Sequence, residues 1–242
     1  MTKLFDDNAR KKWESQMDFG SLNYCDTFHV KDMIVREVSA KAIRPLISKY
    51  HYSKTMPDST LYCFAGYFGE QIAGVVSFGM GVGKNQYTAI LPSIKQGEYC
   101  ELTRLWSPDG MPKNTESKLI SMSIKMLPKE IKLVVSFADP SRNHMGTIYQ
   151  ATNFLYTGTS NGGKMLVTAD GTEKHPRLLG IYRMRHEKYK ETPTDELMKI
   201  LGYIYTESAK KHRYIMFRGS KKEVSMMKKS IKSSILPYPK HS

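Results

Sequence analysis

Residues 131–154 read IKLVVSFADPSRNHMGTIYQATNF, and this stretch decides the fold class. Its first eight residues are apolar except for Lys132 and Ser136, which is typical of a buried strand. Residues 146–154 can form a short helix, and a β-rich region follows at residues 155–168. A strand, a crossover helix and a returning strand make one unit of an α/β sheet. The sequence therefore predicts an α/β protein.

The segments before this stretch predict the antiparallel part of the same sheet. Their expected order is strand, helix, three antiparallel strands and helix, at residues 33–39, 40–50, 61–68, 72–78, 98–106 and 114–126. The hairpin is indicated by Gly69-Glu70-Gln71 between two β-rich runs. Residues 79–97 contain glycine and proline and are expected to form a loop. We therefore expect a mixed, mostly antiparallel sheet flanked by helices.

Composition favours a globular protein that is neither secreted nor inserted in a membrane. Hydrophobic residues make up 40% and charged residues 25% of the 242 residues, and both are ordinary globular values. No apolar run approaches the roughly 18 residues that suggest a membrane span. The polar start of the chain has no apolar segment of a signal peptide, so we expect a cytoplasmic protein. We expect an N-terminal extension at 1–32, one catalytic domain at 33–219 and a basic tail at 220–242.

The three cysteines do not predict a metal or disulfide site. Cys25, Cys63 and Cys100 are an odd number, and they are too far apart for a C-x-x-C motif. Free, buried thiols are the simplest expectation.

Positive charge is concentrated in the last third of the chain. Residues 174–242 contain 17 Lys and Arg against 6 Asp and Glu, a net charge of +11 out of +14. Such a basic end predicts binding to a polyanion, with double-stranded DNA as the expected partner. Aromatic residues alternate with these charges around Tyr182 and Tyr214, which suits stacking on bases. The alternative is a basic tail that is only solvated. Residues 170–177 form an expected turn that could reach a DNA groove, and a solvated loop is the alternative there. No lipidation signal favours a membrane.

The loop after the first predicted helix brings together side chains that can do chemistry. His51, Tyr52 and Ser53 place an imidazole, a phenol and a hydroxyl on neighbouring residues. Histidine can act as a base near neutral pH, and tyrosine can donate a proton or stack on a base. The alternative is structural, because a histidine at a helix C-terminus also interacts favourably with the helix dipole.

Other candidate residues lie at the ends of predicted strands and helices. Asp139 follows the 131–138 strand, where α/β sheets present ligands and catalytic groups, although Asp is also common in turns. Arg104 lies within an apolar strand and could hold a phosphate or carboxylate of a donor, or pair with an acidic neighbour. Asn114 and Ser117 begin a helix, and helix N-termini bind anions. Ordinary capping explains them equally well.

Several short motifs together resemble the Mom family of phage DNA adenine-modification proteins. They are His51-Tyr52-Ser53, Glu101-Leu102-Thr103-Arg104-Leu105-Trp106, Asn114-Thr115-Glu116-Ser117, Phe137-Ala138-Asp139-Pro140 and the helix with Tyr149. The resemblance covers roughly residues 33–220. It implies a GNAT-like acyltransferase fold and conversion of the exocyclic amine of adenine in duplex DNA to a carbamoylmethyl derivative, which protects phage DNA from restriction. It also implies a catalytic set of His51, Tyr52, Ser53, Asp139 and Tyr149.

The chain departs from the general acetyltransferase pattern at the donor loop. The Arg/Gln-x-x-Gly-x-Gly/Ala loop that binds acetyl-coenzyme A is absent, and residues 107–114 read SPDGMPKN instead. Acetyl-coenzyme A is therefore a doubtful cofactor, and an unidentified small-molecule or carrier-bound donor is expected. An iron requirement is associated with such proteins, but His51, Tyr52, Asp139 and Tyr149 are unlike the usual ligands of two histidines and one carboxylate. No metal ligand is assigned.

Two other functions remain open at this stage. One is an acetyl-coenzyme A-dependent GNAT N-acyltransferase that acts on a protein or small molecule, which calorimetry with that cofactor would detect. The other is a DNA-binding accessory protein with a GNAT-like fold and no catalytic activity, which would bind DNA and leave its nucleosides unchanged.

Overall fold

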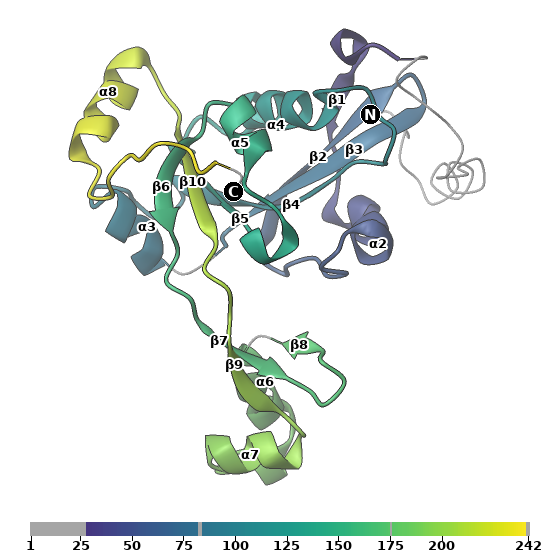
Figure 1. Cartoon of the computed structure of the whole chain (residues 1–242), viewed down its shortest axis with the longest axis vertical. Helices are drawn as coiled ribbons and strands as arrows, with labels where there is room; N and C mark the ends of the chain where they lie inside the picture. Colours follow the sequence, from purple (N-terminus) through teal and green to yellow (C-terminus); the bar gives the residue numbers. More distant parts are fainter. Residues whose placement is uncertain (1–27, 82–83, 175, 241–242) are drawn as a thin grey trace. The chain divides into compact units, whose positions relative to one another are not determined.

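The computed structural model describes residues 28–81, 84–174 and 176–240 (Figure 1). Most of the expected N-terminal extension, including Cys25, lies outside these residues. The chain divides into two compact units. The first contains the chain up to Phe137, Gly146–Gly158 and Arg213–Ser242, and the second contains Ala138–Met145 and Thr159–His212. The expected domain limits at 32/33 and 219/220 stay a prediction.

A seven-stranded sheet forms the centre of the first unit. Its strand order is β1-β2-β3-β4-β5-β10-β6. The strands are β1 (Ile34–Glu37), β2 (Thr60–Phe68), β3 (Gln71–Gly79), β4 (Tyr99–Trp106), β5 (Leu133–Ala138), β6 (Leu155–Thr159) and β10 (His212–Phe217). Strands β1 to β4 pair antiparallel, whereas β4 and β5 pair parallel. The predicted α/β class with a mixed, mostly antiparallel sheet flanked by helices is confirmed.

Helices α2 (Ala40–Tyr50) and α4 (Thr115–Met126) cover opposite faces of this sheet (Figure 1). α2 packs its buried Ile43, Leu46 and Ile47 against a core that includes Ala65 of β2. On the other face, a Cβ atom added to Gly74 of β3 would meet Leu119 of α4 at 3.2 Å. The close approach of α4 to the sheet therefore depends on residues without a side chain.

The sequence does not predict the far end of the sheet correctly. The expected loop at 79–97 contains helix α3 (Lys84–Ile90), whose Tyr87 and Ile90 are buried. This helix shares a core with α8 (Lys221–Ser230), which lies in the expected basic tail. A capping box between Ser220 and Glu223 starts α8, and its Val224 and Met227 pack against that core. Helix α5 is also shorter than expected, at Thr147–Ala151, because Asn153 adopts a positive φ of 63°.

The expected β region at 155–168 is two strands rather than one. It contains β6 of the large sheet and β7 (Lys164–Val167), which belongs to a second sheet with order β8-β7-β9. Residues 160–163 separate the two strands, and Gly158 near the end of β6 has a positive φ of 87°. β8 (Glu173–Lys174) and β9 (Ile204–Glu207) complete the second sheet.

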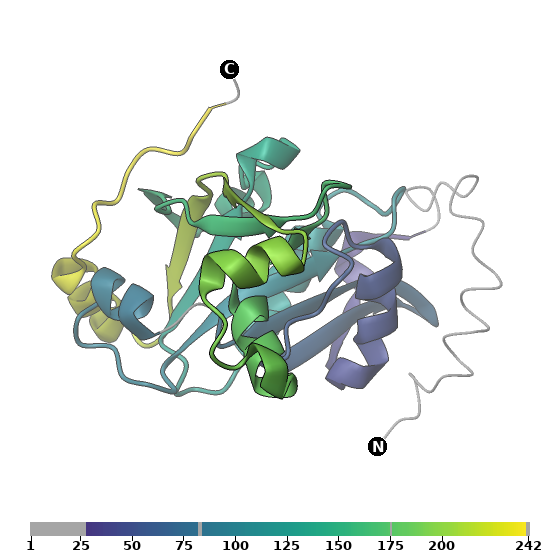
Figure 2. The same cartoon turned by 90° about the horizontal axis from the view of Figure 1, so that it is seen from below.

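The second unit has its own small core. Helices α6 (Arg177–Arg185) and α7 (Thr194–Ile200) pack on its sheet, as seen from below in Figure 2. The buried side chains of this core are Leu166, Leu179, Leu197 and Met198.

Two expectations from composition can be compared with the described residues. Cys63 and Cys100 are free and buried, as predicted, and burial raises the pKa of the Cys63 thiol to about 11. None of the helices in the described ranges is long and apolar enough to cross a membrane.

Candidate functional site

Strands β4 and β5 separate at the centre of the first unit. Their parallel pairing ends at Glu101 and Val135, although both strands continue. Beyond this point the hydroxyl of buried Ser136 donates to the carbonyl of Leu102 at 3.4 Å. The phenol of Tyr149, from α5, hydrogen-bonds Ser136 at the same place. Burial raises the pKa of Tyr149 to about 12, partly offset by that hydrogen bond, so the phenol stays protonated near neutral pH.

Charged and phenolic side chains surround Tyr149. Tyr52 and Glu101 both lie near enough to raise its pKa. Burial lowers the pKa of the Arg104 guanidinium, while Tyr52 and Glu101 favour its charged form. We call Tyr52, Glu101, Arg104, Ser136 and Tyr149 the central cluster. The cluster joins residues of the α2–β2 loop, β4, β5 and α5 at the point where the sheet opens.

Neighbouring aromatic rings hold Tyr149 in place. Its ring centroid lies 5.3 Å from that of Tyr214 and 5.5 Å from that of Phe154. Gly146 precedes α5 with φ at 78°, and the Tyr214 ring occupies the space that a Cβ atom at Gly146 would need. A side chain at Gly146 would therefore displace Tyr214 and, with it, Tyr149.

The predicted loop residues His51, Tyr52 and Ser53 do lie together. His51 is buried, and its Nδ1 accepts the backbone N–H of Ser53 at 3.1 Å. A neutral His51 therefore carries its proton on Nε2. The Tyr52 ring lies against the His51 ring, with centroids 4.3 Å apart and the ring planes tilted by 31°. Tyr52 is 51% exposed, so part of its side chain is accessible to a ligand.

Arg104 fixes this loop to β4. Its Nε donates to the carbonyl oxygen of Thr55 at 2.7 Å, and its Nη1 donates to that of Thr103 at 2.6 Å. These bonds give Arg104 a positioning role that the sequence did not suggest. Its expected contact with a donor stays a prediction.

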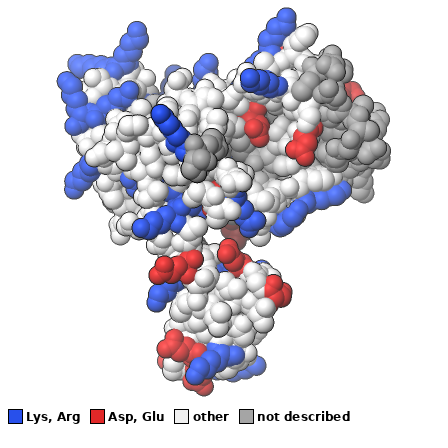
Figure 3. All heavy atoms as spheres, in the orientation of Figure 1, with Lys and Arg blue, Asp and Glu red and all other residues white. Residues whose placement is uncertain are grey.

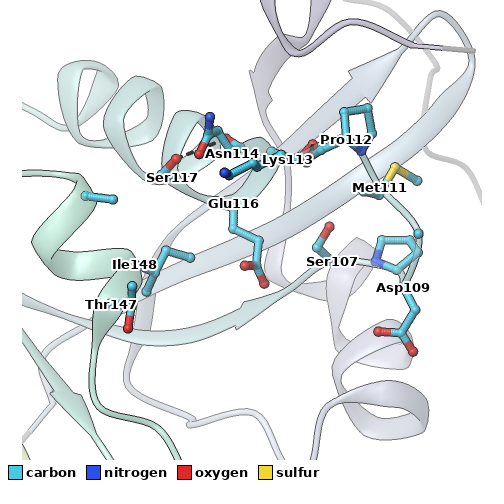
Figure 4. A pocket seen from close by; sticks show the side chains of 14 residues that line it. Ser107, Asp109, Met111, Pro112, Lys113, Asn114, Glu116, Ser117, Thr147 and Ile148 are labelled. Carbon is cyan, nitrogen blue, oxygen red and sulfur yellow. Dashed lines mark hydrogen bonds between the residues drawn. The ribbon is translucent and has the colours of Figure 1, made fainter. Parts of the chain in front are cut away.

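A pocket of about 490 Å³ lies at the start of α4 (Figure 4). Residues 107–117 line one side, and Thr147, Ile148 and Ala151 of α5 line the other. The expected donor residues Asn114 and Ser117 belong to this lining. Asn114 occupies the N-cap position but makes no side-chain capping bond, and the Ser117 hydroxyl donates to the Asn114 carbonyl at 3.1 Å. The predicted position of the cap is right, and the predicted side-chain cap is wrong.

Asp139 belongs to the second unit, so its expected meeting with His51 and Tyr52 stays a prediction. Its Oδ1 accepts the backbone N–H of Ser141 at 3.0 Å and the Ser141 hydroxyl at 2.6 Å. Its Oδ2 lies 3.9 Å from Nζ of Lys211. The carboxylate therefore has a structural role as a cap, and it is only 15% exposed.

The predicted residues do not fit an iron site. Within the described residues, no three His, Cys, Asp or Glu side chains are grouped as metal ligands. Nδ1 of His51 already accepts a hydrogen bond, and Tyr149 resists the deprotonation that metal binding needs.

Sequence reasoning missed Glu101, Glu116 and Ser136 as parts of the site. The sequence indicates Glu101 as part of a family motif and as a possible partner of Arg104, and it indicates Ser136 as a polar residue in an apolar strand. The signal that could have identified Ser136 is a polar residue within such a strand, because a buried hydroxyl needs a partner. Glu116 lies in a pocket that exists only when α4 and α5 come together, so no local pattern predicts it.

The basic end of the chain separates into exposed and buried parts. Residues 213–242 contain eight Lys and Arg and one acidic residue, and Figure 3 shows lysines gathered over α8. The exposed lysines of this helix are Lys221, Lys222, Lys228 and Lys229. The expected stacking by Tyr214 is wrong, because that ring is fully buried. Arg218 is also engaged, since it donates to the carbonyls of Leu127, Pro128 and Ile131 after α4.

Comparison with known proteins gives the family. The model of the Mom protein family matches residues 32–240. The chain belongs to the Mom family. The methylcarbamoylase Mom of Escherichia phage Mu is 30% identical over 132 residues, which are 53% of this chain and 55% of that protein. The alignment thus spans about half the length of this curated Mom relative.

Solved acetyltransferases resemble the chain more distantly. A ribosomal-protein-alanine N-acetyltransferase from Brucella melitensis is 7% identical with a TM-score of 0.42, covering 76% of this chain and 99% of the other. A GNAT family acetyltransferase from Elizabethkingia anophelis is 10% identical with a TM-score of 0.40, and the match covers 77% of this chain and 99% of the other. Both TM-scores are below 0.5, so these similarities carry no conclusion about function.

Proposed function

We propose that the chain modifies adenine in double-stranded DNA, converting the exocyclic amine to a carbamoylmethyl derivative that protects the DNA from restriction. The observation that carries the proposal is the central cluster, which joins the half-exposed Tyr52 to buried Tyr149 within a chain of the Mom family. We further propose that this happens in the cytoplasm of a phage host.

Access to the adenine amine in a duplex requires that the base leave the helix. Extrusion costs a few kcal/mol, and phosphate contacts by the α8 lysines would help to offset that cost. The exposed face of Tyr52 offers a surface for the extruded ring, because base–aromatic stacking contributes about 1–3 kcal/mol. The base would then lie beside Glu101 and Arg104.

Group transfer requires a bond between the amine nitrogen and the methylene carbon of the donor. The leaving group of the donor departs with its electron pair, and the amine loses one proton. Glu101 is the carboxylate of the central cluster that can accept this proton, and it lies near both Tyr149 and Arg104. The phenol oxygen of Tyr149 can accept a hydrogen bond from the reacting groups, because its single hydrogen is directed to Ser136. His51 positions Tyr52, and we expect Asp139 to complete this centre.

Restriction protection in cells tests the proposal. Plasmid DNA from cells that express the chain should resist enzymes whose target sites contain adenine, whereas DNA from cells with an empty vector is cut. Full cutting of both plasmids would overturn the proposal.

A further inference from the structure

The segment after α8 returns to the edge of the large sheet. We call residues 231–240 the C-terminal strap, which Figure 1 shows in yellow. The N–H of Lys232 donates to the carbonyl of Ile90 in α3 at 2.9 Å, and the N–H of Leu236 donates to the carbonyl of Tyr156 in β6 at 2.9 Å. Because β6 is the edge strand of the sheet, the strap covers backbone groups that could otherwise pair with another chain.

Covering this edge accounts for only part of the strap. Leu236 and Tyr156 form a single antiparallel bridge. Pro237 and Pro239 have no N–H group with which to extend that pairing. The side chain of Tyr238, between the two prolines, nevertheless makes further contacts with the first unit.

Tyr238 contacts two residues that pack on Tyr149. Its hydroxyl donates to the carbonyl of Phe154 at 2.7 Å, and its ring stacks on Tyr214 with centroids 6.5 Å apart and planes tilted by 29°. The rings of Phe154 and Tyr214 are the same two that lie 5.5 Å and 5.3 Å from the ring of Tyr149. The hydroxyl of Tyr214 also accepts a hydrogen bond from Nε2 of Gln150, the next residue of α5. Tyr238 thus touches both aromatic neighbours of the buried phenol in the central cluster.

The exposure of Tyr238 distinguishes it from the core residues that it contacts. It is 41% exposed, whereas Tyr214 and Phe154 are fully buried. Aromatic pairs at these separations favour particular ring orientations, so the loss of Tyr238 would allow Tyr214 to turn and Tyr149 to move with it. We propose that Tyr238 is a positioning residue, which holds Tyr149 in its reacting orientation through Tyr214 and Phe154. This inference rests on the proposed function, in which Tyr149 contacts the reacting groups.

NMR of the full chain with carbon-13-labelled tyrosine tests this inference. The signal of Tyr149 is assigned by its absence in Tyr149→Phe. Tyr238→Leu removes the hydroxyl and the ring, and Tyr238→Phe removes only the hydroxyl. Ile235→Ala is the matched control, because Ile235 is a similarly exposed side chain of the same strap. We expect the Tyr149 signal to shift in Tyr238→Leu, to shift less in Tyr238→Phe and to stay at its parental position in the control.

Modification of DNA in cells that express the same variants gives the second measurement. The fraction of modified adenine should fall about tenfold with Tyr238→Leu, because a small displacement of a group in a reacting centre causes a large loss of rate. It should recover in part with Tyr238→Phe and stay at the parental level with Ile235→Ala. DNA affinity should be equal in all variants, since the expected effect of Tyr238 is on Tyr149.

An unmoved Tyr149 signal in Tyr238→Leu, or equal modification by Tyr238→Leu and the control, would overturn the inference. If Tyr238→Leu does not fold, an unmoved signal in Tyr238→Phe overturns it instead. Weaker DNA binding with an unmoved signal would make Tyr238 a DNA contact. Failure of the proposed function gives a different result, namely unmodified adenine with the parental chain, and the NMR shift is measured without the reaction.

Discussion

The phenol of Tyr149 hydrogen-bonds the hydroxyl of Ser136 one residue beyond the last pair of the β4–β5 ladder, Glu101 and Val135. A side chain from α5 thus makes contact where the two strands no longer pair. This contact links buried Tyr149 of the central cluster to the sheet. We expect it to support both stability and activity.

Replacing Tyr149 by Phe should lower the free energy of unfolding by about 1 kcal/mol, because it removes one buried hydrogen bond and keeps the ring. Modification of adenine should fall much more than this small change in folding explains. Chemical denaturation measures the first effect, and the fraction of modified nucleoside measures the second. Full activity in Tyr149→Phe would exclude the phenol from the reaction.

The raised pKa of Tyr149 also predicts a dependence on pH. The folded pKa of Tyr149 is about 12, above the ordinary tyrosine value of 10.0, so the phenol loses its proton more readily in the unfolded chain. Its contribution to stability is complete below pH 10 and is lost as the pH rises toward 12, at about 1.4 kcal/mol for each unit. Buried Tyr67, with a pKa of about 12, acts in the same direction. Tyr149→Phe should therefore reduce the slope of stability between pH 10 and 12, and an unchanged slope would contradict this account.

Replacing Arg104 by Lys keeps the charge but loses the geometry that holds Thr55 and Thr103. We expect a loss of about 1–3 kcal/mol in stability and faster hydrogen exchange of the amides at residues 53–55. Modification should decrease because Tyr52 is no longer held in place. If the loop exchanges at the parental rate, Arg104 does not position it.

The carboxylate of Asp139 can be tested without removing its structural role. Asp139→Asn retains an oxygen that accepts the hydrogen bonds from Ser141, so the local fold should persist. A catalytic carboxylate predicts loss of modification with unchanged stability. Asp170→Asn is the matched control, since Asp170 also accepts hydrogen bonds within its own turn, from Thr168 and Thr172. Equal activity of both variants would remove Asp139 from the site.

The lysines of α8 should account for much of the salt dependence of DNA binding. Deleting residues 220–242 would also expose the core under Val224 and Met227, so substitution is the better test. Replacing all four exposed α8 lysines by Gln should weaken binding to every DNA sequence. The logarithm of the DNA-binding constant should then fall less steeply with the logarithm of salt concentration, by about 0.9 for each lost phosphate contact. The control carries Gln at four exposed lysines elsewhere, namely Lys41, Lys95, Lys125 and Lys129. The same slope in both variants would place the DNA contacts elsewhere.

How well the sequence predicted the structure depends on how local each signal is. Helix α2 begins and ends at the predicted residues, because Ser39 caps it and apolar residues repeat at helical spacing. Helix α3 was missed because seven residues within a Gly- and Pro-containing segment give little periodicity, and its burial depends on α8 from the far end of the chain. The return of β10 between β5 and β6 is likewise a long-range pairing.

The same distinction applies to the site. The His51–Ser53 loop was found because its residues are adjacent in the sequence. Glu101 and Glu116 come from separate elements and become functional candidates only through their proximity to Tyr149.

Tyr52 provides the most direct test of the central claim, because its hydroxyl can be removed while the stacking ring is kept. Nucleosides from plasmid DNA of cells that express the parental chain or Tyr52→Phe should be compared by mass spectrometry. The account predicts deoxyadenosine that carries one carbamoylmethyl group in place of an amine hydrogen with the parental chain. It predicts a large loss of that nucleoside with Tyr52→Phe at equal expression and equal DNA affinity. Unmodified adenine with a parental chain that binds DNA tightly would contradict the claim and indicate a DNA-binding protein without this activity.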